Sequence, residues 1–263
     1  MNAEKSNSDD VVMVDWPEPG IGVLTFNRPH RKNAMSPSCI PHLVDAVNTL
    51  AADREVRVVI VTGAGGAFCT GMDLSRLDEM APREVEPTVA WMQQLHAFSV
   101  ALASIPQPTI AAVPGPAIGG GLGMALGCDL RIASPTARFG ATFAKMALGP
   151  DAGVSKTLAR IVGEAKALDM LLTGELIGSE EALRLGLVTQ IADDALGEAL
   201  AIARRWSEVP GYASQQIKRA MRLSADADIQ TTLMEIEPQT QAELICHPDF
   251  FTNAADWLSG HSG

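Results

Sequence analysis

The sequence predicts an α/β fold that is followed by a helical C-terminal region. Up to about residue 190, short apolar runs typical of buried strands alternate with segments that have the spacing of amphipathic helices. From about residue 195 onward the pattern is helical throughout. Hydrophobic residues make up 47% of the 263-residue chain, which is ample for a sizeable core.

The strands are predicted by short apolar runs that end at turn residues. The first run is β-prone and ends at an Asn-Arg-Pro turn. The next two are almost wholly apolar, as expected for a sheet that is covered on both faces. The predicted strands are residues 21–26, 57–63, 108–115, 129–134 and 187–192.

Helical spacing and helix-start residues predict the other elements. Ser36-Pro37 is typical of a helix start, and that helix is expected to run to about Ala52 with Pro41 in its first turns. Pro238 is expected to kink or break the last predicted helix. The other predicted helices are residues 87–104, 153–172, 179–186, 195–207, 211–223 and 228–246.

Composition excludes several classes of protein. The formal net charge of -11 argues against non-specific nucleic-acid binding. No apolar run reaches the roughly 20 residues that span a bilayer, and the polar residues 1–10 are expected to form a disordered tail rather than a secretory signal. The cysteines lack CxxC spacing and the histidines lack metal-site spacing, which predicts reduced thiols, no metal and a cytoplasmic protein.

Two glycine-rich loops follow predicted buried strands, AFCTGMDL (67–74) and AIGGGLG (117–123). Glycine lets the backbone approach a ligand, and a helix that begins in such a run has free N–H groups at its positive end. Two such N–H groups can converge on one oxygen as an oxyanion hole, or the glycines can serve only close packing. Composition leaves both roles open. The preceding segment VIVTGAGGAF (59–68) also suggests a dinucleotide-binding loop, but it lacks the required glycine spacing after Gly63, and the sequence has no Tyr-x-x-x-Lys pair.

Asp151 is a candidate catalytic carboxylate, in a Pro-Asp-Ala-Gly turn before a predicted helix. An aspartate at this place ordinarily caps the helix, and spacing alone favours that role. His96 lies on the predicted helix 87–104 and is interpreted as a packed helix histidine.

Five segments carry a joint pattern that is far more specific than either glycine loop alone. They are NRPHRKNAM (27–35), AFCTGMDL (67–74), GPAIGGGLGMALGCDLRIAS (115–134), FGATFAKMALGPDAGVSKTLARIVG (139–163) and LLTGELIGSEEALRLGLVTQI (171–191). In this order they closely resemble the crotonase, or enoyl-CoA hydratase/isomerase, superfamily. The resemblance runs from about residue 11 to residue 223 and weakens toward the C-terminus.

The resemblance implies a crotonase-like ββα spiral core that binds acyl-CoA thioesters. Two backbone N–H groups, those of Met72 and Gly120, would hold the thioester oxygen while negative charge develops on it. The apolar residues of segment 75–98 would shape the acyl pocket, and Arg28, Arg31 and Lys32 could meet the nucleotide phosphates. The family's substrate-contact positions correspond here to His30, Arg31, Ala34, Thr70, Gly71, Asp73, Leu74, Gly119 and Phe143.

The sequence departs from the family's hydratases at both of their catalytic glutamates. Gly123 and Phe143 stand at those positions, and neither side chain can transfer a proton. The pattern is closer to aspartate-using branches, which include ring-opening enoyl-CoA isomerases, naphthoyl-CoA synthases and chlorobenzoyl-CoA dehalogenases. A dehalogenase-like enzyme would use Asp151 as a nucleophile on an aryl ring, and its helical histidine would correspond to His96, twelve residues before Pro108. The tryptophan of the dehalogenases is replaced here by Phe143. It therefore implies an enoyl-CoA isomerase with Asp151 as acid/base. The alternatives are a hydratase with non-standard water activation and a catalytically inactive CoA-ester-binding protein.

The resemblance also implies a division of the chain and an assembly. Residues 11–194 would form the catalytic core, and residues 195–263 would form a helical region that mediates trimer formation. We expect a homotrimer or a dimer of trimers, with an acyl-CoA thioester as the substrate. No cofactor is expected, because coenzyme A is part of the substrate.

Overall fold

The computed structural model describes residues 11–75 and 84–260, and the chain divides into two compact units. The first unit is Met1–Ser207 and holds every described strand, whereas the second, Glu208–Gly263, is helical. The expected tail, residues 1–10, lies outside the described residues.

A six-stranded sheet forms the centre of the first unit. Its first strand pairs antiparallel with the second, and all the other neighbours run parallel. In spatial order the strands are β1 (Val12–Glu18), β2 (Ile21–Phe26), β3 (Val58–Gly63), β4 (Thr109–Val113), β6 (Leu130–Ala133) and β9 (Gln190–Ile191).

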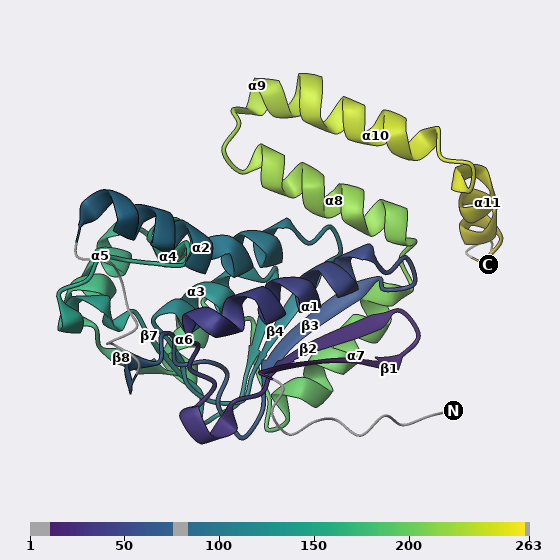
Figure 1. The fold of residues 1–263 in the computed structure, drawn as a ribbon. Coiled ribbons are helices and arrows are strands. Elements are labelled where there is room, and N and C mark those ends of the chain that lie inside the picture. Colours follow the sequence, from purple (N-terminus) through teal and green to yellow (C-terminus); the bar gives the residue numbers. More distant parts are fainter. Residues whose placement is uncertain (1–10, 76–83, 261–263) are drawn as a thin grey trace. The chain divides into compact units, whose positions relative to one another are not determined.

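Alternate residues of the central strands enter two hydrophobic cores on opposite faces of the sheet. Val59 and Val61 pack into the core beneath α1 (Ile40–Ala52) and α2 (Val85–Ser104). Val58 and Ile60 pack against α7 (Ala195–Ser207) on the other face. Figure 1 shows the strands lying between α1 and α7. Burial on both faces explains why these strands are apolar throughout.

Helix α7 belongs to the first unit. Its buried face, which includes Ala199 and Ile202, completes the core against β3 and β4. The two units consequently divide after Ser207, one helix beyond the expected boundary at residue 194.

A three-stranded sheet and shorter helices complete the first unit. The strands are β5 (Ala117–Ile118), β7 (Arg138–Gly140) and β8 (Leu176–Gly178). The helices are α3 (Gly120–Gly127), α4 (Val154–Val162), α5 (Glu164–Thr173) and α6 (Ser179–Arg184), with the 3-10 turns η1 (Pro29–Arg31), η2 (Pro37–Cys39) and η4 (Thr142–Met146). The predicted helix 153–172 is two helices, because Gly163 between them has a φ of +82° that ends the first.

The second unit consists of α8 (Gly211–Ser224), α9 (Ile229–Thr231), the π-helical segment η5 (Thr232–Ile236), α10 (Glu237–Ile245) and α11 (Phe250–Gly260). The carboxylate of Asp228 caps α9 by accepting from the Thr231 N–H. Pro238 lies in the first turn of α10, directly after the π-helical segment. The chain stays helical from residue 229 to residue 245, so the helix changes type at this point and is not broken. Across both units, the described residues include no helix that is long and apolar enough to cross a membrane.

Candidate active site

The two glycine-rich loops lie side by side beyond the carboxyl ends of β3 and β4. The backbone N–H groups of Phe68 and Cys69 donate to the Pro116 carbonyl, at 3.1 Å each. The Ile118 N–H donates to the Cys69 carbonyl at 3.0 Å. Parallel strands end at the same edge of a sheet, so this pairing follows from the topology.

Glycine is required where the two loops touch. A Cβ atom added to Gly121 would lie 2.0 Å from the Cys69 carbonyl oxygen, and one added to Gly71 would lie 3.1 Å from the Gly120 nitrogen. Gly119 has φ 57° and ψ -124°, a conformation that side chains exclude. Close packing is therefore one role of these glycines.

The same packing leaves both predicted donor groups open. Gly120 is the first residue of α3, so its N–H has no partner within the helix. The bridge between Met35 and Met72 uses the Asp73 N–H and the Gly71 carbonyl, at 2.8 Å each, and leaves the Met72 N–H outside the ladder. Neither N–H donates to another described residue. Gly71, which precedes Met72, lies against Gly120, so the residues that carry the two N–H groups are close neighbours.

A partly buried ion pair connects the NRPHRKNAM loop to the loop that carries Met72. Nη2 of Arg28 lies 3.0 Å from Oδ2 of Asp73, and Nη1 of Arg28 donates to the Ala34 carbonyl. Asp73 is 5% exposed, and its other oxygen, Oδ1, accepts a hydrogen bond from the Ser75 hydroxyl at 2.6 Å. Arg28 is therefore used inside the protein rather than toward a phosphate, and the Asp73 side chain supports the loop.

The pKa of Asp73 gives a test of this support. The hydrogen bond from Ser75, followed by the hydrogen bond and charge of Arg28, holds the pKa of the Asp73 carboxyl below its usual range, although burial opposes the shift. A lowered native pKa stabilises the fold above the unfolded-state pKa, and this contribution is lost as the pH falls through the native pKa. We expect the wild-type protein to be more stable than Asp73→Asn at about pH 6 and the difference to narrow toward about pH 3. Urea unfolding of both proteins across this range is the measurement, and a difference that stays constant with pH would contradict the assignment.

The remaining residues predicted on the NRPHRKNAM loop differ in exposure. His30 and Arg31, in η1, are exposed, and Ala34 is buried. The Thr70 hydroxyl donates to the Lys32 carbonyl at 3.3 Å, so this loop and the Met72 loop are also tied at that point. The structure thus places His30 and Arg31 on a solvent-facing turn beside the site's loops.

Phe143 is buried, whereas Leu74 is exposed. Phe143, in η4, is 6% exposed, and its ring lies 3.9 Å from the place of a Cβ on Gly119. Leu74 is 46% exposed at the end of the Met72 loop. Phe143 therefore borders the start of α3 as an apolar wall.

Asp151 and His96 are brought together from segments 55 residues apart. Nε2 of His96, on α2, is hydrogen-bonded to Oδ1 of Asp151, in the turn before α4. The same oxygen accepts from the Ala152 N–H at 2.6 Å. The His96 side chain is 40% exposed and the Asp151 side chain 31%, so solvent and ligands can reach both.

Two sequence interpretations change at this pair. Gly153 is the N-cap of α4 and no side chain caps that helix, so Asp151 does not have the expected capping role. The interpretation of His96 as a packed helix histidine is wrong, because its ring is 40% exposed and bonded to Asp151. The one signal for His96 in the sequence is its place twelve residues before Pro108, the spacing of the helical histidine in the dehalogenases of the resembled family.

Gly123 lets the Asp151 turn rest directly on α3. A Cβ on Gly123 would lie 2.5 Å from the Ala152 carbonyl oxygen and 2.6 Å from the Ala152 Cβ. Ala152 itself has a φ of 51°, a conformation that non-glycine residues keep only where the surroundings hold it. The position that carries the first glutamate in the resembled hydratases thus has no room for any side chain here.

Gly123→Ala should destabilise the protein by about 1–3 kcal/mol, the usual effect of overpacking a tight contact. The new methyl group meets backbone atoms of Ala152, which cannot move without shifting the Asp151 turn. Thermal and urea unfolding measure the effect. Gly127→Ala, at the end of the same helix with nothing within 4 Å, is the matched control and should gain about 0.5–1 kcal/mol. Equal stability of the two variants would contradict the contact.

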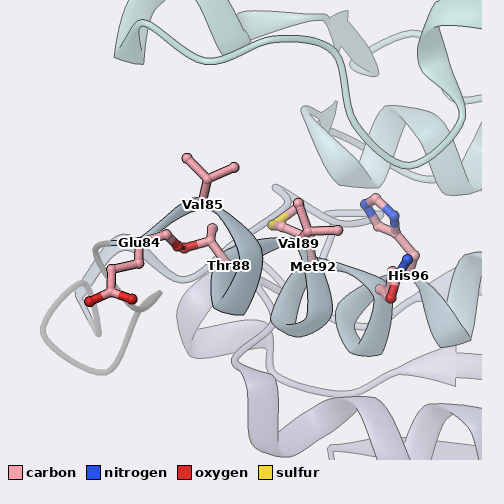
Figure 2. A pocket seen from close by; sticks show the side chains of 7 residues that line it. Glu84, Val85, Thr88, Val89, Met92 and His96 are labelled. Atoms are coloured by element: carbon pink, nitrogen blue, oxygen red, sulfur yellow. Dashed lines mark hydrogen bonds between the residues drawn. The ribbon is translucent and has the colours of Figure 1, made fainter.

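A pocket of about 410 Å³ runs along α2 and includes His96. Its apolar lining is Val85, Val89 and Met92, and its polar lining adds Glu84, Thr88 and Gln93 to His96. Figure 2 shows the His96 ring on the same side of α2 as the side chains of Val85, Val89 and Met92. The expected acyl segment 75–98 lines this pocket from residue 84 onward, and its residues 76–83 lie outside the described part of the chain.

Cys69 is the thiol nearest to the glycine contacts, and it is buried beneath Gly121. Burial raises the pKa of its thiol to about 12, so the reactive thiolate is not formed at neutral pH. Among the described residues, no three His, Cys, Asp or Glu side chains are grouped so that they could hold a metal ion.

The chain is similar to known proteins in both sequence and structure. Residues 17–253 match the family model described as enoyl-CoA hydratase/isomerase. The chain is 36% identical over 253 residues to the probable enoyl-CoA hydratase echA12 of Mycobacterium leprae, covering 94% of this chain and 86% of that protein. An enoyl-CoA hydratase structure from Bacillus anthracis matches with a TM-score of 0.89 and 29% identity over 95% of this chain and 96% of that one. A probable enoyl-CoA hydratase/isomerase from Mycobacterium abscessus matches with a TM-score of 0.84 and 34% identity over 94% of each chain.

Proposed function

Since the chain belongs to the enoyl-CoA hydratase/isomerase family and has the α/β crotonase fold, we propose that it is an enoyl-CoA isomerase with Asp151 as acid/base. The Met72 and Gly120 N–H groups would hold the thioester oxygen as an enolate. The observation that carries this proposal is the position of Asp151. Its turn rests on Gly123, which is three residues, or about 4.5 Å along the helix, beyond Gly120.

This geometry supports proton transfer next to a thioester. With the thioester oxygen at Gly120, the adjoining carbons of the acyl group would extend along α3 toward Asp151. The carboxylate would remove a proton from one carbon, and the electron pair would move into the thioester as the enolate. Return of a proton to another carbon shifts the double bond, so no water is consumed. Gly123 and Phe143 cannot contribute to this step, since neither titrates.

Hydration is the second candidate function, and two observations favour it. The His96–Asp151 pair has the chemistry of a general base that can activate water. In addition, the Mycobacterium leprae relative and the Bacillus anthracis structure are named as hydratases. The absence of both glutamates also keeps a catalytically inactive CoA-ester-binding protein as an alternative, against which Asp151 and the open N–H groups argue.

The proposed substrate contacts remain those of the two glycine loops and the NRPHRKNAM loop. We propose no cofactor, since coenzyme A belongs to the substrate, and a homotrimer or dimer of trimers as the working assembly. Assembly is supported by large exposed apolar side chains on the helices of the second unit, which are Ile217, Met221, Leu233, Met234, Phe251 and Trp257.

Mass spectrometry of a panel of acyl-CoA thioesters tests the function. Isomerisation leaves the substrate mass unchanged and moves the double bond, which fragmentation or chromatography detects. Hydration adds the mass of water, and thioester hydrolysis releases free coenzyme A. Products with added water only would favour the second candidate, and binding of the panel without any product would favour the inactive alternative.

A further inference from the structure

We propose that His96 is a second catalytic residue, which exchanges a proton with the acyl group at a carbon farther from the thioester than the one Asp151 serves. This inference rests on the proposed function and extends it. Its starting point is that the hydrogen-bonded pair has two open ends. Oδ1 of Asp151 and Nε2 of His96 bond to each other, and no described residue is hydrogen-bonded to Oδ2 of Asp151 or Nδ1 of His96.

His96 shares a pocket with apolar side chains that an acyl group could contact. His96 is part of the lining of the α2 pocket, together with the apolar side chains of Met92 and Val89. Asp151 is held at the α3 side by the contact of its turn with Gly123. In the proposed arrangement, an acyl group that starts at Gly120 would pass Asp151 first and His96 second, before it reaches the apolar part of the pocket.

The chemistry of the pair suits a transfer between two carbons. The hydrogen bond at Nε2 fixes which ring nitrogen faces outward, so Nδ1 is the atom that gains or loses a proton. In the conversion of a 3-enoyl-CoA to its 2-enoyl isomer, the Asp151 carboxylate takes a proton from C2 and the electron pair moves into the thioester enolate. The protonated His96 ring gives its Nδ1 proton to C4, and the double bond moves from C3 to C2. The carboxylic acid and neutral ring that result regain their starting states by proton exchange with solvent, which reaches both side chains.

His96→Gln separates this role from a positioning role. The Gln amide nitrogen can donate to Asp151 in place of Nε2, but the amide does not titrate. We expect kcat for 3-octenoyl-CoA isomerisation to fall by about 10²- to 10⁴-fold, as for loss of a general acid. His96→Asn should fall similarly, and His42→Gln, on the exposed face of α1, should keep wild-type kcat. If His96 only positioned Asp151, His96→Gln would stay within a few-fold of wild type, which would overturn the proposal.

An isotope experiment tests the proton transfer to C4 independently of the rate. With 3-octenoyl-CoA deuterated at C2 and water as solvent, a proton supplied by His96 leaves protium at C4 of the product. In His96→Gln the residual turnover must use Asp151 for both carbons, so a larger share of deuterium should move from C2 to C4. Equal shares in wild type and variant would overturn the proposal. Circular dichroism and thermal unfolding establish that both variants are folded.

Failure of the proposed function gives a different result. If the wild-type protein converts no enoyl-CoA, NMR of the histidine ring nitrogens with octanoyl-CoA as the probe still tests the placement. A change in the Nδ1 signal of His96 with octanoyl-CoA, but not with coenzyme A alone, would support the assignment of this nitrogen to the acyl side. An unchanged Nδ1 signal in bound protein would overturn it. Loss of activity in Asp151→Asn alone, with His96→Gln active, would retain the proposed function and reject this inference.

Discussion

Replacing Asp151 with asparagine should lower kcat for enoyl-CoA isomerisation by about 10²- to 10⁴-fold, the range for loss of a general acid or base. The asparagine Oδ1 can still accept the hydrogen bonds from His96 and the Ala152 N–H, so the turn should keep its shape. Basicity is then the only property removed. Substrate affinity should change little, and steady-state kinetics on the substrate found by the acyl-CoA screen separate kcat from KM.

Asp169→Asn is the matched control for this variant. Asp169 lies on α5, is 56% exposed and pairs with Lys166 on the surface, so its replacement should leave kcat unchanged and stability almost so. An Asp151→Asn protein with wild-type kcat would remove Asp151 from the mechanism. A large rise in KM at constant kcat would instead place Asp151 in substrate binding.

Replacing Gly120 with proline should lower kcat by about 10²- to 10³-fold, the typical effect of removing one oxyanion-hole donor. Proline has no N–H, and its fixed φ is well tolerated at the first position of a helix, where Gly120 lies. The substitution therefore deletes the proposed donor while α3 can still form. Stopped-assay kinetics measure the rate, and thermal unfolding checks the fold.

Gly120→Ala distinguishes the effect of losing the N–H from the effect of adding a side chain at this position. A Cβ here would lie 3.8 Å from the Gly71 Cα, an ordinary contact, and the N–H is kept. This variant should retain most of the activity that the proline variant loses. If the two variants were equally impaired, the added bulk rather than the lost donor would explain the effect.

Burial on both faces decides which strands can be predicted from sequence. β2, β3 and β4 are apolar nearly throughout and lie where the sequence places them. β1 is not predicted, since its side chains are intermediate or exposed and pairing with β2 makes it a strand. The second sheet is missed for a related reason, because strands as short as β5 carry no periodicity of their own.

The candidate site divides in the same way between local and long-range features. The glycine loops and the Asp151 turn are local patterns, so the sequence can single them out. The partners of Asp151 and Asp73 are 55 and 45 residues away, and only the packing of separate elements brings His96 and Arg28 to them. The close packing and the open N–H groups, which composition presents as alternatives, occur together in the structure.

The contact between Gly123 and Ala152 makes residue 123 and the Asp151 turn dependent on each other. A glutamate at 123 would collide with the turn that carries Asp151. A glutamate at this position and the present Asp151 turn are therefore incompatible in one chain. Conversion toward hydration by laboratory evolution should therefore require libraries that vary position 123 and the 151–153 turn together, because beneficial changes at either place are conditional on the other.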